Sequence, residues 1–162
     1  VDADIYINVQ GDEPLIDYKN ILKVIECKKK YFHHVVNAMT YINKNEDPTN
    51  INIPKVVVDK NNNLIYMSRL PIPGNKDVFS NDKKRFLKQV CIYAFNKNEL
   101  CLFGNEQYKA RYEKNEDIEI LRFFDLGISV KMTMLNSSSL AIDVLEDVKA
   151  VESILIKKEG KR

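Results

Sequence analysis

Short β-rich runs alternate with amphipathic helical segments along this chain, and that alternation constrains its fold more than any other feature. Apolar and polar residues alternate over residues 5–9 before the chain breaks at Gly11 and Pro14, which predicts a strand. Asp17 suits the N-cap of a following helix that ends in three lysines. The predicted strands are residues 5–9, 34–42, 55–59, 64–69, 86–95, 128–135 and 137–144, and the predicted helices are residues 17–30, 96–103, 116–127 and 145–155.

Residues 55–59 and 64–69 are separated by KNNN, which has the composition of a hairpin connection. The helix predicted over 116–127 has acidic residues in its first turn and Gly127 as its stop. Strands alternate with helices everywhere except at the hairpin. The sequence therefore predicts an α/β fold with a mostly parallel sheet.

The chain's 162 residues, 44% of them hydrophobic, are enough for one compact domain over residues 1–162. A net charge of +2 with both signs interspersed gives no electrostatic footprint for nucleic acid. Three cysteines without a CxxC motif favour reduced thiols in a cytoplasmic protein over a disulfide framework or a zinc site. No apolar run approaches the roughly 20 residues of a membrane span, so no membrane partner is expected.

Two aspartates are candidate metal ligands. Asp12 follows the first predicted strand, and Asp143 lies at the end of the last one. If both strands run parallel in one sheet, the two carboxylates meet at the same edge and suit Mg²⁺. The alternatives are a turn at Asp12 and a capping box from Asp143 to Glu146.

Arg69 ends the strand 64–69, where its guanidinium suits a bidentate grip on a carboxylate or phosphate or, alternatively, a surface ion pair. Lys55 has the same two interpretations. No Ser/His/Asp order, GxSxG or GxxxxGK[ST] motif occurs, and the five glycines form no phosphate cradle. Acyl transfer and P-loop chemistry are therefore not expected.

Several segments together resemble one known family. INVQGDEPL, PKVVVD with LIYMSRLPIP, VCIYAF, EILRFF and LAIDVLEDV stand in the order and approximate spacing of the 3-deoxy-manno-octulosonate (Kdo) cytidylyltransferases. The similarity runs over nearly the whole chain, and NVQGDEP is its most specific part. The resemblance implies a three-layer, Rossmann-like nucleotide-diphospho-sugar transferase fold with a β-hairpin insertion.

The resemblance also implies an activity. Such an enzyme transfers CMP from CTP to Kdo or a Kdo-like acidic sugar and releases pyrophosphate, for lipopolysaccharide or capsule synthesis. It implies a homodimer as well. Asp12 and Asp143 would be the catalytic Mg²⁺ ligands, and Gln10 would hold the nucleotide or sugar near the metal.

By the same resemblance Arg69 would contact the acidic sugar or a phosphate, while Tyr93, Glu119 and Gln89 would line the sugar pocket. The family commonly has histidine where this chain has Gln89, and glutamine where it has Ile120. Exchanged hydrogen-bonding groups can reject a substrate strongly. A variant of Kdo is therefore an alternative acceptor.

Family members begin with a strand and a PARxxSxRLPGK-type loop that holds the triphosphate, and neither occurs in this sequence. The chain thus resembles the C-terminal two-thirds of the family fold, truncated at the N-terminus, and little CTP turnover is expected from these residues alone. Two alternative functions stay open: a sialate-type cytidylyltransferase, and a non-catalytic binding module or relic of the same fold.

Overall fold

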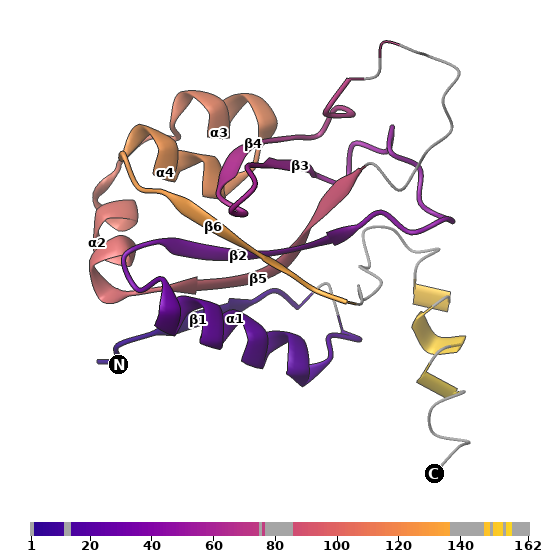
Figure 1. Ribbon diagram of the computed structural model, residues 1–162, viewed down its shortest axis with the longest axis horizontal. Coiled ribbons are helices and arrows are strands. Elements are labelled where there is room, and N and C mark those ends of the chain that lie inside the picture. The colour runs from indigo at the N-terminus through magenta and orange to yellow at the C-terminus, as the bar shows by residue number, and fades with distance from the viewer. Residues whose placement is uncertain are drawn as a thin grey trace.

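The computed structural model describes residues 2–11, 14–74, 76, 86–136, 148, 149, 151–153, 155 and 156. One six-stranded sheet has the order β4-β3-β5-β2-β6, with β1 also paired to β5 (Figure 1). The strands are β1 (Tyr6–Val9), β2 (Val35–Tyr41), β3 (Lys55–Val58), β4 (Leu64–Ser68), β5 (Leu87–Phe95) and β6 (Val130–Met134). The helices are α1 (Tyr18–Lys30), α2 (Lys97–Asn105), α3 (Arg111–Glu116), a 3₁₀ helix (Glu119–Leu121) and α4 (Arg122–Asp125).

Most of the predicted elements are confirmed. Asp17 is the N-cap of α1, where its side chain accepts a hydrogen bond from the Lys19 amide. The predicted hairpin is the antiparallel pair β3–β4. The strand predicted over 137–144 lies outside the described residues, whereas those described between 148 and 156 are helical, as predicted. No helix in the described ranges is long and apolar enough to cross a membrane.

The sheet is mixed, so the predicted α/β class is confirmed but its predicted parallel majority is wrong for the described strands. Among the described strands, only β2 and β6 pair in parallel, whereas β5 runs antiparallel to β1, β2 and β3. The hairpin reverses the chain between β3 and β4, and β5 keeps the direction of β4. The chain therefore enters β5 in the direction opposite to β1, β2 and β3.

Apolar clusters pack on both faces of the sheet. Helix α1 lies on one side of the sheet and α3 and α4 on the other, which gives the three layers that the resemblance implies (Figure 1). Successive residues of a strand point to opposite faces. Val36 accordingly packs in the cluster beneath α1, together with Val24. Val35 packs in the cluster on the other face, together with Phe123 of α4.

The single helix predicted over 116–127 is wrong, because the chain breaks at Asp117. This residue adopts a left-handed backbone conformation (φ 52°) between α3 and the 3₁₀ helix. Arg69 holds the chain at the break: its Nε donates to the Glu116 carbonyl (2.6 Å) and its Nη2 to the Asp117 carbonyl (2.9 Å). These tertiary bonds replace the helical ones that the periodicity favours. The predicted stop at Gly127 is confirmed by its φ of 67°.

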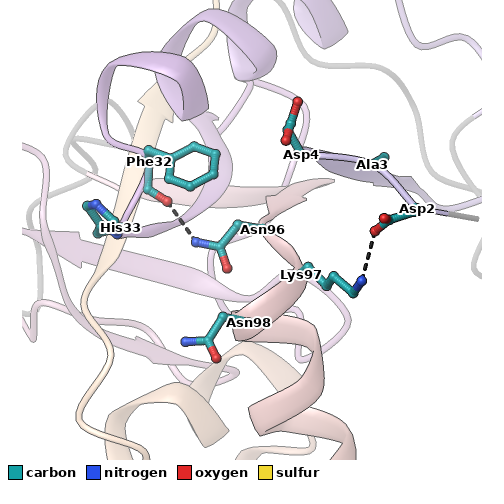
Figure 2. A pocket seen from close by; sticks show the side chains of 8 residues that line it. All are labelled: Asp2, Ala3, Asp4, Phe32, His33, Asn96, Lys97 and Asn98. Atoms are coloured by element: carbon teal, nitrogen blue, oxygen red, sulfur yellow. Dashed lines mark hydrogen bonds and ion pairs between the residues drawn. The ribbon is translucent and has the colours of Figure 1, made fainter.

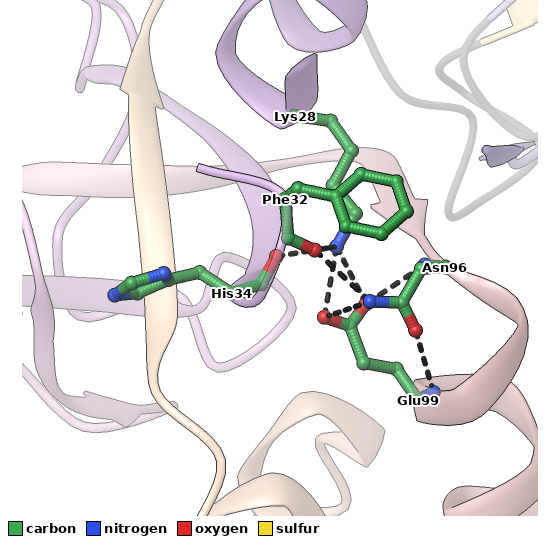
Figure 3. A network of polar contacts seen from close by, with 5 residues as sticks. All are labelled: Lys28, Phe32, His34, Asn96 and Glu99. Atoms are coloured by element: carbon green, nitrogen blue, oxygen red, sulfur yellow. Dashed lines mark hydrogen bonds and ion pairs between the residues drawn. The ribbon is translucent and has the colours of Figure 1, made fainter. Parts of the chain in front are cut away.

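A buried ion pair joins α1 to α2 (Figure 3). Lys28 Nζ donates to both Glu99 carboxylate oxygens, at 2.8 and 2.7 Å, and to the carbonyls of Phe32 and His34. Burial lowers the pKa of Lys28, although Glu99 opposes the shift. Glu99 also accepts from the Asn96 amide and so closes the capping box of α2.

Candidate functional site

Two adjoining pockets lie beside β5. The first, here called the polar pocket, has a volume of about 340 Å³, and the second, the aromatic pocket, about 240 Å³. They share Gln10, Tyr93 and Glu119. The polar pocket is otherwise lined by Asn52, Pro54, Arg69, Gln89, Cys91, Asp117 and Ile118, and the aromatic pocket by Asn8, Phe95, Leu100, Phe103, Ile120 and Phe123.

All five residues predicted to bind substrate line the polar pocket. Gln10 follows β1, Arg69 follows β4, Gln89 and Tyr93 belong to β5, and Glu119 begins the 3₁₀ helix. The fold thus gathers side chains that are far apart in the sequence. Asp12 and Asp143, the predicted metal ligands, lie outside the described residues. The described part of the chain holds no group of three His, Cys, Asp or Glu residues suited to a metal ion.

Arg69 is a structural clamp at the wall of the polar pocket. Besides its bonds to the Glu116 and Asp117 carbonyls, its Nη1 donates to the Ile51 carbonyl (2.9 Å). The three bonds tie the loop before β3 to the turn between α3 and the 3₁₀ helix. A guanidinium has five N–H donors, so one on each Nη remains available to a ligand after these contacts.

Lys55 lies behind this wall with its side chain fully buried. Its Nζ donates to the Asn50 carbonyl (2.8 Å) and, through a short bond, to the Arg69 carbonyl. Burial, followed by the nearby charge of Arg69, lowers the pKa of Lys55 to about 8. Of the two interpretations of Lys55, an anion grip and a surface ion pair, neither describes these contacts, which brace the backbone.

Glu116 also holds the wall of the polar pocket in place, although the sequence marked it only as the start of a helix. Its carboxylate accepts from the Arg69 amide (2.9 Å) and from the Tyr66 hydroxyl (3.2 Å). Burial and the Glu116 charge raise the pKa of Tyr66, so this hydroxyl keeps its proton. The wall of the polar pocket is therefore fixed from the hairpin and from α3 at once.

Asn37 was missed by the sequence analysis. It is fully buried in β2, where its Nδ2 donates to the carbonyls of Val90 and Ile92, both at 3.0 Å. Its Oδ1 accepts from Gln89 Nε2 (3.1 Å), which also donates to Tyr93 Oη (3.1 Å). The available signal was a lone amide inside the otherwise apolar run VVNAM.

A larger and more open hollow of about 470 Å³ lies beside the start of α2 (Figure 2). Three of its polar side chains bind other parts of the chain: Asn96 Nδ2 donates to the Phe32 carbonyl, and Lys97 pairs with Asp2. None of the predicted site residues lines it. The polar and aromatic pockets are therefore the better candidate site.

The fold and the gathered residues agree with a nucleotidyltransferase family. A family model described as "Cytidylyltransferase" matches residues 1–132, so the chain belongs to the cytidylyltransferase family. It is 34% identical over 158 residues to the 3-deoxy-manno-octulosonate cytidylyltransferase of Christiangramia forsetii, covering 96% of this chain and 62% of that protein. For the enzyme of the same name from Thermodesulfovibrio yellowstonii the identity is 36% over 157 residues, with coverages of 95% and 61%.

Solved structures agree with this assignment. The CMP:2-keto-3-deoxy-manno-octonic acid synthetase solved in complex with CTP superposes with a TM-score of 0.85 at 28% identity, covering 98% of this chain and 64% of that one. The inositol-1-phosphate CTP transferase of T. maritima, at 18% identity, has a TM-score of 0.57 over 94% of this chain and 55% of its own. This second likeness shows the fold alone.

Proposed function

We propose that the protein carrying this chain is a Kdo cytidylyltransferase, which transfers CMP from CTP to 3-deoxy-manno-octulosonate and releases pyrophosphate. The observation that carries the proposal is the convergence of Gln10, Arg69, Gln89, Tyr93 and Glu119 on the polar pocket. The relatives named for this activity support it, and the chain spans 62% of the length of the first of them.

The reaction needs positioning more than covalent catalysis. The anomeric hydroxyl oxygen attacks the α-phosphorus in line, the new P–O bond forms as the bond to pyrophosphate breaks, and the hydroxyl proton passes to water. Tyr93 and Glu119 line both pockets and would hold the sugar. Arg69, already braced by three carbonyls, would offer its remaining N–H groups to an anionic group of the substrates.

Mg²⁺ is the proposed metal, with Asp12 and Asp143 as its ligands. Carboxylates are the protein ligands that Mg²⁺ prefers, and Asp12 follows Gln10 of the polar pocket by two positions in the sequence. When bound, the ion would neutralise phosphate charge and lower the pKa of the attacking hydroxyl. We also propose that residues 1–162 form one domain of a cytoplasmic homodimer whose CMP-sugar serves lipopolysaccharide or capsule synthesis.

The test uses the protein at its full natural length, with CTP, Mg²⁺ and either Kdo or N-acetylneuraminate as the acceptor. We expect Kdo-dependent release of pyrophosphate together with a CMP-sugar product. Release only with N-acetylneuraminate would replace the proposed acceptor with a sialic acid. Absence of turnover with both acceptors would favour the non-catalytic binding module.

The proposed metal ligand is tested with Asp12→Asn. We expect nearly all Mg²⁺-dependent activity to be lost while the free energy of unfolding changes little. The matched control is Asp17→Ala, which removes the N-cap of α1 and should cost about 1 kcal/mol of stability with activity retained. If Asp12→Asn behaves like that control, Asp12 is a turn residue and not a metal ligand.

A further inference from the structure

A bulge in β5 brings two pocket residues together. Asn37 of β2 lies opposite Tyr93, but the next residue, Ala38, lies opposite Val90. Cys91 and Ile92 therefore have no opposite residue on β2. In a regular strand, positions four apart are separated by about 13 Å. The bulge bends and locally shortens β5, so that the side chains of Gln89 and Tyr93 approach each other. Gln89 Nε2 donates a hydrogen bond to Tyr93 Oη at 3.1 Å.

Asn37 fills the bulge, and its amide has a single possible orientation. The carbonyls of Val90 and Ile92 can only accept hydrogen bonds, so Asn37 must present its NH₂ group to them. Its Oδ1 then necessarily faces Gln89. Because Asn37 is fully buried, reversing its amide would leave buried carbonyls without a donor, which is costly.

The orientation of Gln89 follows from that of Asn37. Asn37 Oδ1 can only accept, so Gln89 must face it with its own NH₂ group. The two hydrogens of that group are donated to Asn37 Oδ1 and Tyr93 Oη. Gln89 lines the polar pocket. The group that it can still offer to a ligand there is its carbonyl oxygen, a pure acceptor.

We propose that Gln89 selects the acceptor sugar by accepting a hydrogen bond from one of its hydroxyl groups, and that Asn37 is the positioning residue that fixes this polarity. The inference rests on the proposed function and adds a specificity rule to it. A carboxylate, a carbonyl or a fluorine has no proton to donate and is disfavoured beside Gln89. The carboxylate of the sugar therefore binds elsewhere in the site.

Histidine, which the family resemblance leads one to expect at position 89, differs in this respect. An imidazole nitrogen donates or accepts according to its tautomer and its protonation. Gln89, held by Asn37, does not have that freedom. Asn37 and Gln89 together therefore restrict the substrate group beside Gln89 to a hydrogen-bond donor.

The test measures KM for Kdo and for analogues in which one hydroxyl at a time, other than the anomeric hydroxyl that attacks phosphorus, is replaced by fluorine. For the unmodified protein, we expect one analogue to have a KM about tenfold higher or more, because it leaves the Gln89 oxygen unpaired. Gln89→Met keeps the side-chain volume but removes both polar atoms. It should raise KM for Kdo by about the same factor, leave KM for CTP unchanged and abolish discrimination against that analogue.

Asn37→Ala tests the positioning role, since Gln89 stays in place but its amide is free to rotate. The same analogue should lose its disadvantage. Thr40→Val is the matched control, because it removes the buried hydrogen bond of Thr40 Oγ1 to the Leu135 carbonyl without touching the polar pocket. This variant should keep the discrimination of the unmodified protein.

Unchanged discrimination by Gln89→Met at every hydroxyl position would overturn the role of Gln89. Lost discrimination in Gln89→Met but not in a folded Asn37→Ala would overturn the role of Asn37. Absence of turnover by the unmodified protein with Kdo would instead overturn the proposed function, so the two failures are distinguishable.

Discussion

Replacing Lys28 with methionine should lower the free energy of unfolding by about 3–5 kcal/mol, the usual cost of breaking a buried ion pair by removing one partner. The side chains of Lys28 and Glu99 are 0% and 4% exposed, so water cannot replace the lost contact. The variant strands the Glu99 carboxylate and leaves the carbonyls of Phe32 and His34 without this donor (Figure 3).

The loss is large against the roughly 5–15 kcal/mol total stability of a typical domain. The loss of stability should be smaller when Glu99 is neutralised as well. In Lys28→Met the main cost is the unpaired buried charge of Glu99, and not a change in the shape of its side chain. Glu99→Gln keeps an oxygen for the Asn96 amide of the capping box. The double variant Lys28→Met, Glu99→Gln should therefore be about 1–3 kcal/mol more stable than Lys28→Met alone.

Urea unfolding followed by circular dichroism measures both values, provided that the denaturant slope stays constant. The exposed pair of Lys97 and Asp2 is the matched control, with side chains 65% and 83% exposed. Lys97→Met should change stability by less than about 1 kcal/mol. A loss below about 1 kcal/mol in Lys28→Met, or strict additivity in the double variant, would refute the reasoning.

Three further variants test the contacts of Lys55 and Arg69 at the wall of the polar pocket and the left-handed backbone of Gly127. Since the pKa of Lys55 is lowered to about 8 in the folded protein, against 10.5 as its ordinary value, the unfolded chain binds more protons between these pH values. The stability of the unmodified protein should therefore rise with pH relative to Lys55→Met, by up to about 3 kcal/mol, and equal pH profiles from urea titrations would contradict this. Arg69→Lys cannot reach all three carbonyls, so we expect a loss of about 1–3 kcal/mol on urea unfolding and a higher KM for the sugar; unchanged values of both would argue against the clamp. The Cβ added by Gly127→Ala has no atom within 4 Å, but the alanine must adopt a φ of 67°. Thermal unfolding should therefore show a loss of about 1–2 kcal/mol of stability from the backbone conformation alone, and a neutral result would contradict this.

Local signals in the sequence were enough to place most elements. The cap at Asp17, the hairpin across KNNN and the stop at Gly127 each depend on residues within one turn or one loop. The break at Asp117 was not predictable in this way, because Arg69, whose guanidinium holds the Glu116 and Asp117 carbonyls, lies 47 residues or more away. Strand direction likewise depends on pairings that periodicity does not encode.

For the candidate site as well, some features were predictable from the sequence and others depended on contacts between distant residues. The residues around the polar pocket were named from a family resemblance, whereas the contacts that hold them were not apparent. Lys28 was interpreted only as a favourable charge at the end of a helix, yet its partner Glu99 is 71 residues away. Asn37 was an unremarked polar residue in a strand, because the bulge that it fills belongs to β5. Partners distant in the chain left no local pattern to find.

The central place of β5 also has a consequence for how the chain is made. β1 and β2 do not pair with each other, and both need β5, whose last residue, Phe95, pairs with Tyr6. At roughly 5–20 residues per second, a ribosome takes about 4–17 s to pass from β1 to the end of β5. In the part of that interval that follows Tyr41, the apolar strand β2 has neither β5 nor β6 to pair with, so the nascent chain is exposed to aggregation, and to chaperones, until residue 95 emerges.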